Sequence, residues 1–76
     1  MDRFGAKLRT LRKQSDMTMK ELAAALDISA HSYIGKLEMG EKRPSVEMAL
    51  KISRLFNVSL DRLLKDELEL DEDDID

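Results

Sequence analysis

The sequence predicts an all-α fold built from five short helices. Apolar side chains recur at helical spacing in five stretches, helix-capping residues precede most of them, and short connections with Gly, Pro or polar residues separate them. The 76 residues, 42% of them hydrophobic, suffice for one small core near the lower size limit for independent folding. We therefore expect one compact domain.

The first predicted helix has an apolar face formed by Phe4, Leu8 and Leu11, at positions i, i+4 and i+7. Basic residues occupy the rest of this segment. We expect them on the helix surface: Arg3, Lys7, Arg9, Arg12 and Lys13.

The second helix is predicted to begin at Met19, because Thr18 and Glu21 have the spacing of a capping box, in which each side chain binds the other residue's amide. After a short turn, Ser29 is the expected N-cap of a third helix that begins at the next residue. Gly40 ends this helix, since glycine enters the left-handed region at little steric cost.

Two further helices follow Pro44. Ser45 is the natural N-cap of the fourth, which should be largely buried through Val46, Met48, Ala49, Ile52, Leu55 and Phe56. Ser59 caps the fifth, which should return to the core through Leu60, Leu63 and Leu64.

The chain ends in an acidic segment, residues 66–76, which holds 8 of the 16 acidic residues and no basic ones. Residues 1–65 therefore carry a formal charge of +5, although the whole chain carries −3. We interpret 1–65 as the folded domain and 66–76 as a solvated tail. Two alternatives are that the tail competes with phosphates for the basic face, and that Leu68 and Leu70 extend the fifth helix into a dimer seam.

Composition argues against several classes of protein. With no cysteine, one histidine and no phosphate-binding loop, we expect no enzyme, no cofactor and no metal site. No apolar run approaches the length of a spanning helix, and no secretory segment opens the chain. We expect a soluble, cytoplasmic protein that has no membrane contact.

Five sequence words occur in a specific order: LRTLRK (8–13), MTMKELA (17–23), SYIGKLEMG (32–40), KRPS (42–45) and NVSLDRLL (57–64). Through them, residues 3–65 resemble the phage-repressor-like (Cro/CI, Xre-type) helix-turn-helix family. The resemblance implies a compact lambda-repressor-like domain with its motif at about residues 18–38. It also implies a sequence-specific DNA-binding transcriptional regulator, most simply a repressor that binds a dyad-symmetric operator in double-stranded DNA as a homodimer.

The resemblance also implies roles for particular residues. The second helix of such a motif enters the major groove with its N-terminal residues at the base edges. The base-reading positions are Ala30, His31, Ser32 and Lys36. The phosphate-contacting positions are Met19, Lys20, Tyr33, Lys42 and Arg43. Arg12 and Glu38 should form a structural ion pair that fixes the recognition helix.

Some of these roles have alternatives. His31 could equally be an exposed residue without a special role. Tyr33 could pack beside the motif as well as contact a phosphate. Gly35 inside the third helix costs about 1 kcal/mol relative to alanine, and it either lets DNA approach closely or is merely tolerated.

The spacing from Leu22 to Glu38 is one residue longer than is usual in the family, and the family commonly has glutamine where Met19 stands. Either the turn is longer or the third helix starts one residue early, which leaves open which side chain comes first at the bases. Dimerisation is expected through the fifth helix and its flanks, with apolar surface from Val58, Leu60, Leu64 and Leu68. The alternative function is a protein-interaction module, such as an antitoxin or anti-repressor, that binds a protein partner through the acidic tail.

Overall fold

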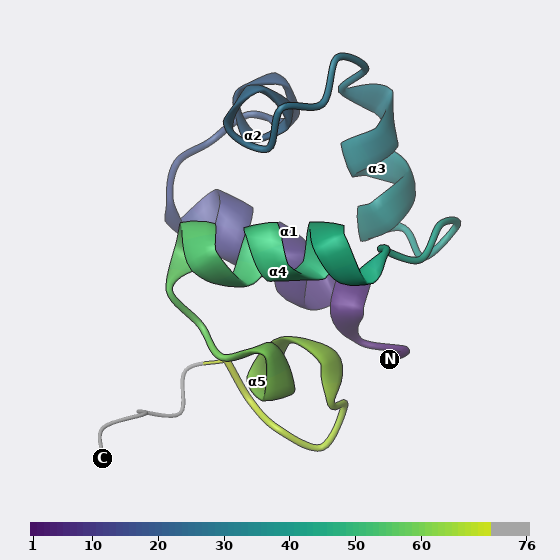
Figure 1. Cartoon of the computed structure of the whole chain (residues 1–76), viewed down its shortest axis with the longest axis vertical. Helices are drawn as coiled ribbons and strands as arrows, with labels where there is room; N and C mark the ends of the chain where they lie inside the picture. The colour runs from purple at the N-terminus through teal and green to yellow at the C-terminus, as the bar shows by residue number, and fades with distance from the viewer. Residues whose placement is uncertain (71–76) are drawn as a thin grey trace.

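The computed structural model describes residues 1–70, and this part of the chain contains five helices and no strand. The helices are α1 (Phe4–Gln14), α2 (Met19–Ala25), α3 (Ser32–Glu38), α4 (Val46–Phe56) and α5 (Leu60–Leu64) (Figure 1). The predicted all-α fold of five short helices is confirmed. Expectations for residues 71–76 lie outside the described residues. No helix within residues 1–70 has both the length and the apolarity needed to cross a membrane.

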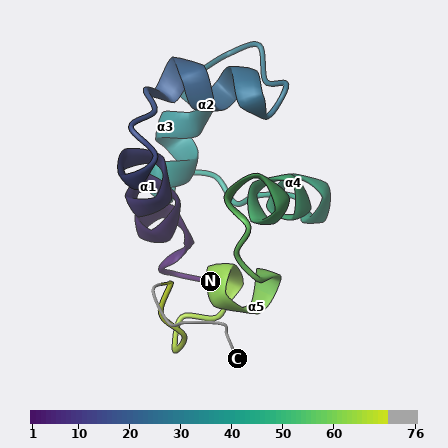
Figure 2. The same ribbon diagram turned by 90° about the vertical axis from the view of Figure 1, so that its left-hand side faces the viewer.

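Helices α1 and α4 form the middle of the molecule, with α2 and α3 at one end and α5 at the other (Figure 1 and Figure 2). Helix α1 contacts both α3 and α5, so it runs between the two ends. Each of the five helices contributes side chains to a single hydrophobic core. Its fully buried large side chains are Leu8, Leu22, Leu26, Ile34, Leu37, Ile52 and Leu63.

Three of the predicted helix caps are present. The Thr18 hydroxyl accepts a hydrogen bond from the Glu21 amide at 3.0 Å, and the Glu21 carboxylate accepts one from the Thr18 amide at 2.9 Å. Ser45 and Ser59 each accept from the amide three residues onward, at 3.0 and 3.1 Å. Gly40 has the predicted positive φ, +79°. Local sequence therefore determines where most helices begin.

The third helix begins later than predicted. Ala30 precedes α3, which starts at Ser32. His31, rather than Ser29, stands at the N-cap position, and its side chain forms no capping hydrogen bond. The prediction that Ser29 caps a helix beginning at Ala30 is therefore wrong, and the connection between α2 and α3 is the longer of the two forms that the spacing permitted.

The reason for the longer turn lies at the end of α2. Asp27 adopts a left-handed conformation with φ of +63°, which reverses the chain immediately after the helix. The amide of Ile28 then donates to the carbonyl of Ala23 at 2.8 Å, and the Ile28 side chain packs against the core. The chain is thus held close to α2 through residue 28, and further residues are needed before α3 begins.

The expectation that all the basic residues of α1 lie on its surface is also wrong, since Lys7 and Arg12 are buried. The Lys7 ammonium group donates to the backbone carbonyls of Arg62 and Lys65, at 2.6 and 2.7 Å. These carbonyls lie at the end of α5, where helices leave acceptors unsatisfied. Burial lowers the pKa of Lys7. A lysine in this position ties α1 to α5.

Helix α4 is less completely buried than predicted. Ala49 and Ile52 are buried and Phe56 packs against the core, but Val46 and Leu55 are 75% and 40% exposed. Ala49, Ile52 and Phe56 follow one another at intervals of three and four, so they form one stripe along the helix. Val46, in the first turn, and Leu55 lie to either side of this stripe. The prediction counted every apolar residue of the helix as buried, whereas only those on the inward stripe are.

The alternative in which Leu68 and Leu70 extend the fifth helix is not found, because α5 ends at Leu64. Residues 65–70, here called the strap, cross the N-terminal end of α1. The Asp66 carboxylate accepts hydrogen bonds from the backbone amides of Asp2 and Arg3, at 2.9 and 2.8 Å. It thereby holds the two residues that directly precede α1, a helix whose own N-cap residue provides no side-chain bond.

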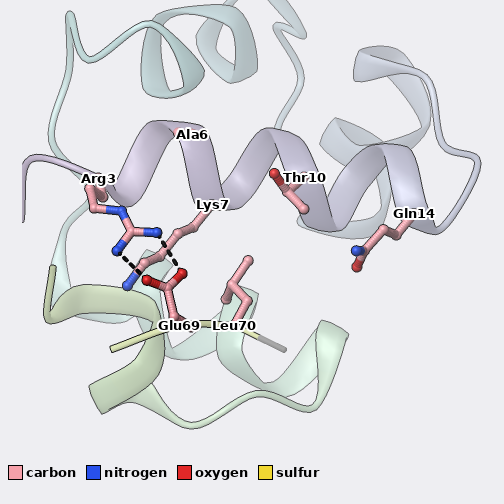
Figure 3. Close-up of a pocket in the computed structure, with 7 residues that line it drawn as sticks. All are labelled: Arg3, Ala6, Lys7, Thr10, Gln14, Glu69 and Leu70. Carbon is pink, nitrogen blue, oxygen red and sulfur yellow. Dashed lines mark hydrogen bonds and ion pairs between the residues drawn. The ribbon is translucent and has the colours of Figure 1, made fainter. Parts of the chain in front are cut away.

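A second acidic residue of the strap is also paired. The Arg3 guanidinium donates two hydrogen bonds to the Glu69 carboxylate, at 3.1 and 2.8 Å, and Figure 3 shows the two groups facing each other beside Lys7. Leu70 packs against the core. The first part of the acidic segment is therefore attached to the domain rather than solvated, and the boundary at residue 65 stays a prediction.

The strap predicts a pH-dependent contribution to stability. Hydrogen bonds from the amides of Arg3 and Asp2 lower the pKa of Asp66 from 3.8 to about 2. Because the folded-state pKa is the lower one, ionised Asp66 stabilises the fold above about pH 4, and this contribution disappears as the pH falls toward 2. Asp66→Asn should therefore lower the urea midpoint at pH 6 and differ progressively less from the parent protein below pH 4.

Urea unfolding followed by circular dichroism from pH 6 to 2.5 measures this. Glu67→Gln, at an exposed carboxylate of the same strap, is the control and should leave the midpoint unchanged. A constant difference between Asp66→Asn and the parent protein at all pH values would contradict the role of the ionised carboxylate.

Candidate nucleic-acid interface

Helix α3 has one buried face and one exposed face. Ile34 and Leu37 are fully buried and attach it to the core. Ser32 and Lys36 lie one turn apart on the opposite side and are exposed. The buried residues make the position of α3 rigid, while the exposed ones are available to a partner.

A glycine lets the end of α3 pack directly on α1. A Cβ atom on Gly5 would lie 2.6 Å from the carbonyl oxygen of Leu37, and it would also overlap the carbonyl group of Glu38. These are backbone atoms, which cannot move aside as a flexible side chain can. Only glycine is compatible with so close an approach. Sequence reasoning did not single out Gly5, whose only signal is a glycine in the first turn of a predicted helix.

An ion pair also holds the end of α3. The Arg12 Nε atom lies 2.6 Å from Glu38 Oε2, and Arg12 Nη2 lies 3.2 Å from Glu38 Oε1. The third donor, Nη1, binds the carbonyl of Met17 at 2.9 Å. The two side chains are only 10% and 2% exposed. The hydrogen bond to Glu38 raises the pKa of Arg12. The two residues that the resemblance paired are therefore in direct contact.

The loop after α3 is held close to the helix. The amides of Glu41 and Lys42 both donate to the carbonyl of Lys36, at 2.9 and 3.3 Å, after the chain reverses at Gly40. These bonds give a donor to a carbonyl at the helix end that would otherwise have none within the helix. They also fix Lys42, and Arg43 after it, beside the last turn of α3.

The beginning of α2 lies against the middle of α3. The sulfur and terminal methyl carbon of Met19 lie 3.6 and 3.9 Å from the position that a Cβ atom on Gly35 would occupy. Met19 is partly buried and packs against the core. Tyr33 also packs against the core, which agrees with the alternative in which this side chain packs beside the motif. The other residues predicted to contact bases or phosphates are exposed: Lys20, Ala30, His31, Ser32, Lys36, Lys42 and Arg43.

Four exposed cations around α3 form no ion pair with the described residues. Within residues 1–70, no ion pair and no side-chain hydrogen bond engages Lys20, Lys36, Lys42 or Arg43. By contrast, Arg3 and Arg12 are paired with carboxylates, and Lys7 with carbonyls. Unpaired cations beside an exposed helix face suit a polyanionic partner.

The arrangement of five helices, with α2 and α3 joined by a short turn, is that of a helix-turn-helix protein. A family model described as helix-turn-helix matches residues 8–63, which is most of the chain. The chain belongs to this family, and the resemblance derived from its sequence is confirmed.

Three relatives are similar to most of this chain. It is 36% identical over 64 residues to the HTH-type transcriptional regulator YqaE of Bacillus subtilis (strain 168). The aligned region covers 84% of this chain and 54% of YqaE. This chain is 29% identical over 70 residues to the cryptic phage CTXphi transcriptional repressor RstR of Vibrio cholerae, covering 91% and 62%. It is 34% identical over 65 residues to control protein C.MunI of a Mycoplasma species, covering 84% and 86%. The chain spans about half the length of several curated relatives that it matches.

The two helical glycines give a matched prediction. Gly5→Ala should lower the free energy of unfolding by about 2–3 kcal/mol, because its methyl group overlaps backbone atoms of α3. Gly35→Ala makes the same chemical change where the nearest atom is 3.6 Å away, so it should raise stability by about 0.5–1 kcal/mol through helix propensity.

Urea denaturation of both variants measures these changes. Equal effects at the two positions would mean that the close approach of α1 and α3 is not a constraint on the fold.

Proposed function

We propose that this protein is a sequence-specific DNA-binding transcriptional regulator that reads the major groove with α3. The observation that carries the proposal is the exposed Ser32–Lys36 face of α3. It lies between cations at the start of α2 and in the loop after α3 that pair with no residue in 1–70. A rigid helix supplies the base contacts and the flanking cations supply the phosphate contacts, which is the division of labour in DNA recognition.

The proposed base contacts follow from side-chain chemistry. Lys36 can donate to O6 and N7 of guanine, and Ser32 can donate or accept. His31 stands at the N-cap position, where its ring nitrogens donate or accept according to protonation and tautomer. Ala30 stands just before it and suits a thymine methyl group. Because the turn is long, we propose that Ala30 and His31 approach the bases from the end of the turn.

The proposed phosphate contacts come from two segments. Lys20 in the first turn of α2 is exposed, and Lys42 and Arg43 are exposed in the loop bonded to the end of α3. Tyr33 and the backbone at Met19 complete the set expected from the family. Because the Met19 side chain packs toward Gly35, its contribution to phosphate binding falls to its amide, with Lys20 as the main side-chain contact.

We propose that the protein acts as a homodimer on a partly palindromic operator and represses transcription by blocking polymerase. The relative RstR is named a transcriptional repressor, which supports repression. A dimer of this class would place its half-sites about 10 bp apart, centre to centre. Dimerisation through α5 is supported by Leu60 and Leu68, which stay partly exposed, whereas Val58 and Leu64 pack against the core.

Selection of genomic DNA fragments on the purified protein, followed by footprinting, tests the proposal. We expect a protected dyad-symmetric site. Lys36→Ala should weaken binding by about 1–3 kcal/mol and relax the preference at one base pair. Lys42→Ala should weaken binding to all sequences and lower the slope of log affinity against log salt by about 1.

Lys65→Ala is the matched control, since Lys65 is an exposed cation that directly follows α5, the helix at the end of the molecule opposite α2 (Figure 1). It should leave both the affinity and the salt slope unchanged. Weak binding without sequence preference that vanishes in moderate salt would instead favour a protein-interaction module, such as an antitoxin or anti-repressor.

A further inference from the structure

The outward face of α1 consists of the exposed residues Ala6, Arg9, Thr10, Lys13 and Gln14. Two of them are cations, Arg9 and Lys13, and within residues 1–70 no ion pair or side-chain hydrogen bond engages either one. They stand four residues apart, so they are neighbours on the helix surface, where two like charges repel each other. Such a pair of cations suits an anionic partner.

These two cations lie on the side of α1 that borders α3. Arg9 follows Gly5 by one helical turn, and Gly5 is where the backbone of α1 meets the end of α3. Lys13 follows Arg9 by the same interval and stands next to Arg12, which binds Glu38. An anion bound to Arg9 and Lys13 would therefore adjoin the end of the proposed recognition helix.

The strap approaches the same face from its other edge. After binding the beginning of α1, it places Leu70 in a hollow that Thr10 and Gln14 also line. Figure 3 shows Leu70 on the side of α1 that carries these two residues. At 3.6 residues per turn, Lys13 lies between Thr10 and Arg9 around the helix. A chain that continues from Leu70 across α1 would thus meet Lys13 first and Arg9 next.

The segment that follows Leu70 has the charge that this face requires. Residues 71–76, which lie outside the described residues, read DEDDID and carry five carboxylates. Six extended residues span about 20 Å, and a helix with its side chains is about 10–12 Å across. The segment is therefore long enough to cross the outward face of α1. Its attachment at Leu70 also keeps its carboxylates at a high local concentration there.

We propose that residues 71–76 bind across the outward face of α1 through ion pairs with Lys13 and Arg9, and that DNA has to displace them. The displacement rests on the proposed DNA-binding function and adds an internal competitor to it. Non-specific binding to DNA comes almost entirely from cations that meet phosphates, whereas operator binding also uses base contacts. The segment therefore weakens non-specific binding more than operator binding, and so raises specificity.

A cycle of full-length variants tests whether the segment and the two cations act on each other. One variant, here called the amide variant, replaces all five carboxylates of the segment: Asp71→Asn, Glu72→Gln, Asp73→Asn, Asp74→Asn and Asp76→Asn. Because it loses two exposed ion pairs, it should bind a random-sequence duplex about five-fold more tightly at low salt. The same five changes should lose most of their effect when Arg9→Gln and Lys13→Gln are already present.

The matched control removes two exposed cations from α4 instead, by Lys51→Gln and Arg54→Gln. In this background, the five amide changes should keep their full effect. An equal effect in all three backgrounds would mean that the segment repels DNA through its charge alone, and it would overturn the ion pairs with α1.

NMR spectra of the full chain without DNA test the contact itself. Between the parent protein and the amide variant, we expect the largest changes among residues 1–70 at the amides of Arg9 and Lys13 and at the Arg9 Nε–H. Unchanged resonances at these positions would overturn the proposal. These spectra do not depend on the proposed function. Failure to bind any operator would overturn that function and the displacement by DNA, while the contact with α1 would be decided by the spectra.

Discussion

The buried ion pair between Arg12 and Glu38 is the interaction on which the orientation of α3 depends. Helices of seven residues, such as α2 and α3, have little intrinsic stability, so tertiary contacts must hold them. The ion pair and the close approach at Gly5 both fasten the end of α3 to α1. Arg12 also binds the carbonyl of Met17, in the segment that leads into α2. One guanidinium group thus connects α1 with both helices of the motif.

The basic residues of the molecule fall into a paired set and an unpaired set. Near the beginning of α1, Arg3 and Lys7 bind the strap and the end of α5, where carboxylates and carbonyls satisfy them. In the last turn of α1, Arg12 is engaged by Glu38. Lys36 on α3 and Lys42 in the loop after it stay unpaired in the described part of the chain. The described acidic residues of the strap therefore pair with the N-terminal segment and Arg3, and not with the cations of α3 and its following loop. Low overall pI is compatible with a basic recognition face because the charges are separated in this way.

Sequence patterns predicted the local features well and the long-range ones poorly. Thr18, Ser45 and Ser59 mark helix starts because a cap involves only residues a few positions apart. The burial of Lys7 depends on carbonyls 55 and 58 residues away, and the requirement for Gly5 depends on the end of α3. No local pattern encodes such contacts. The start of α3 was misplaced because Asp27 and Ile28 hold the chain back against α2.

A double-mutant cycle at Arg12 and Glu38 tests most directly whether this pair orients the recognition helix. Glu38→Ala, Arg12→Ala and the double variant would be compared by urea denaturation and by affinity for the selected operator duplex. We expect each single change to lower the free energy of unfolding by about 2–3 kcal/mol, with the double variant losing clearly less than the sum. Operator affinity should fall in all three variants under conditions where they remain folded. Additive losses of stability, or intact stability and operator binding in Glu38→Ala, would contradict the account.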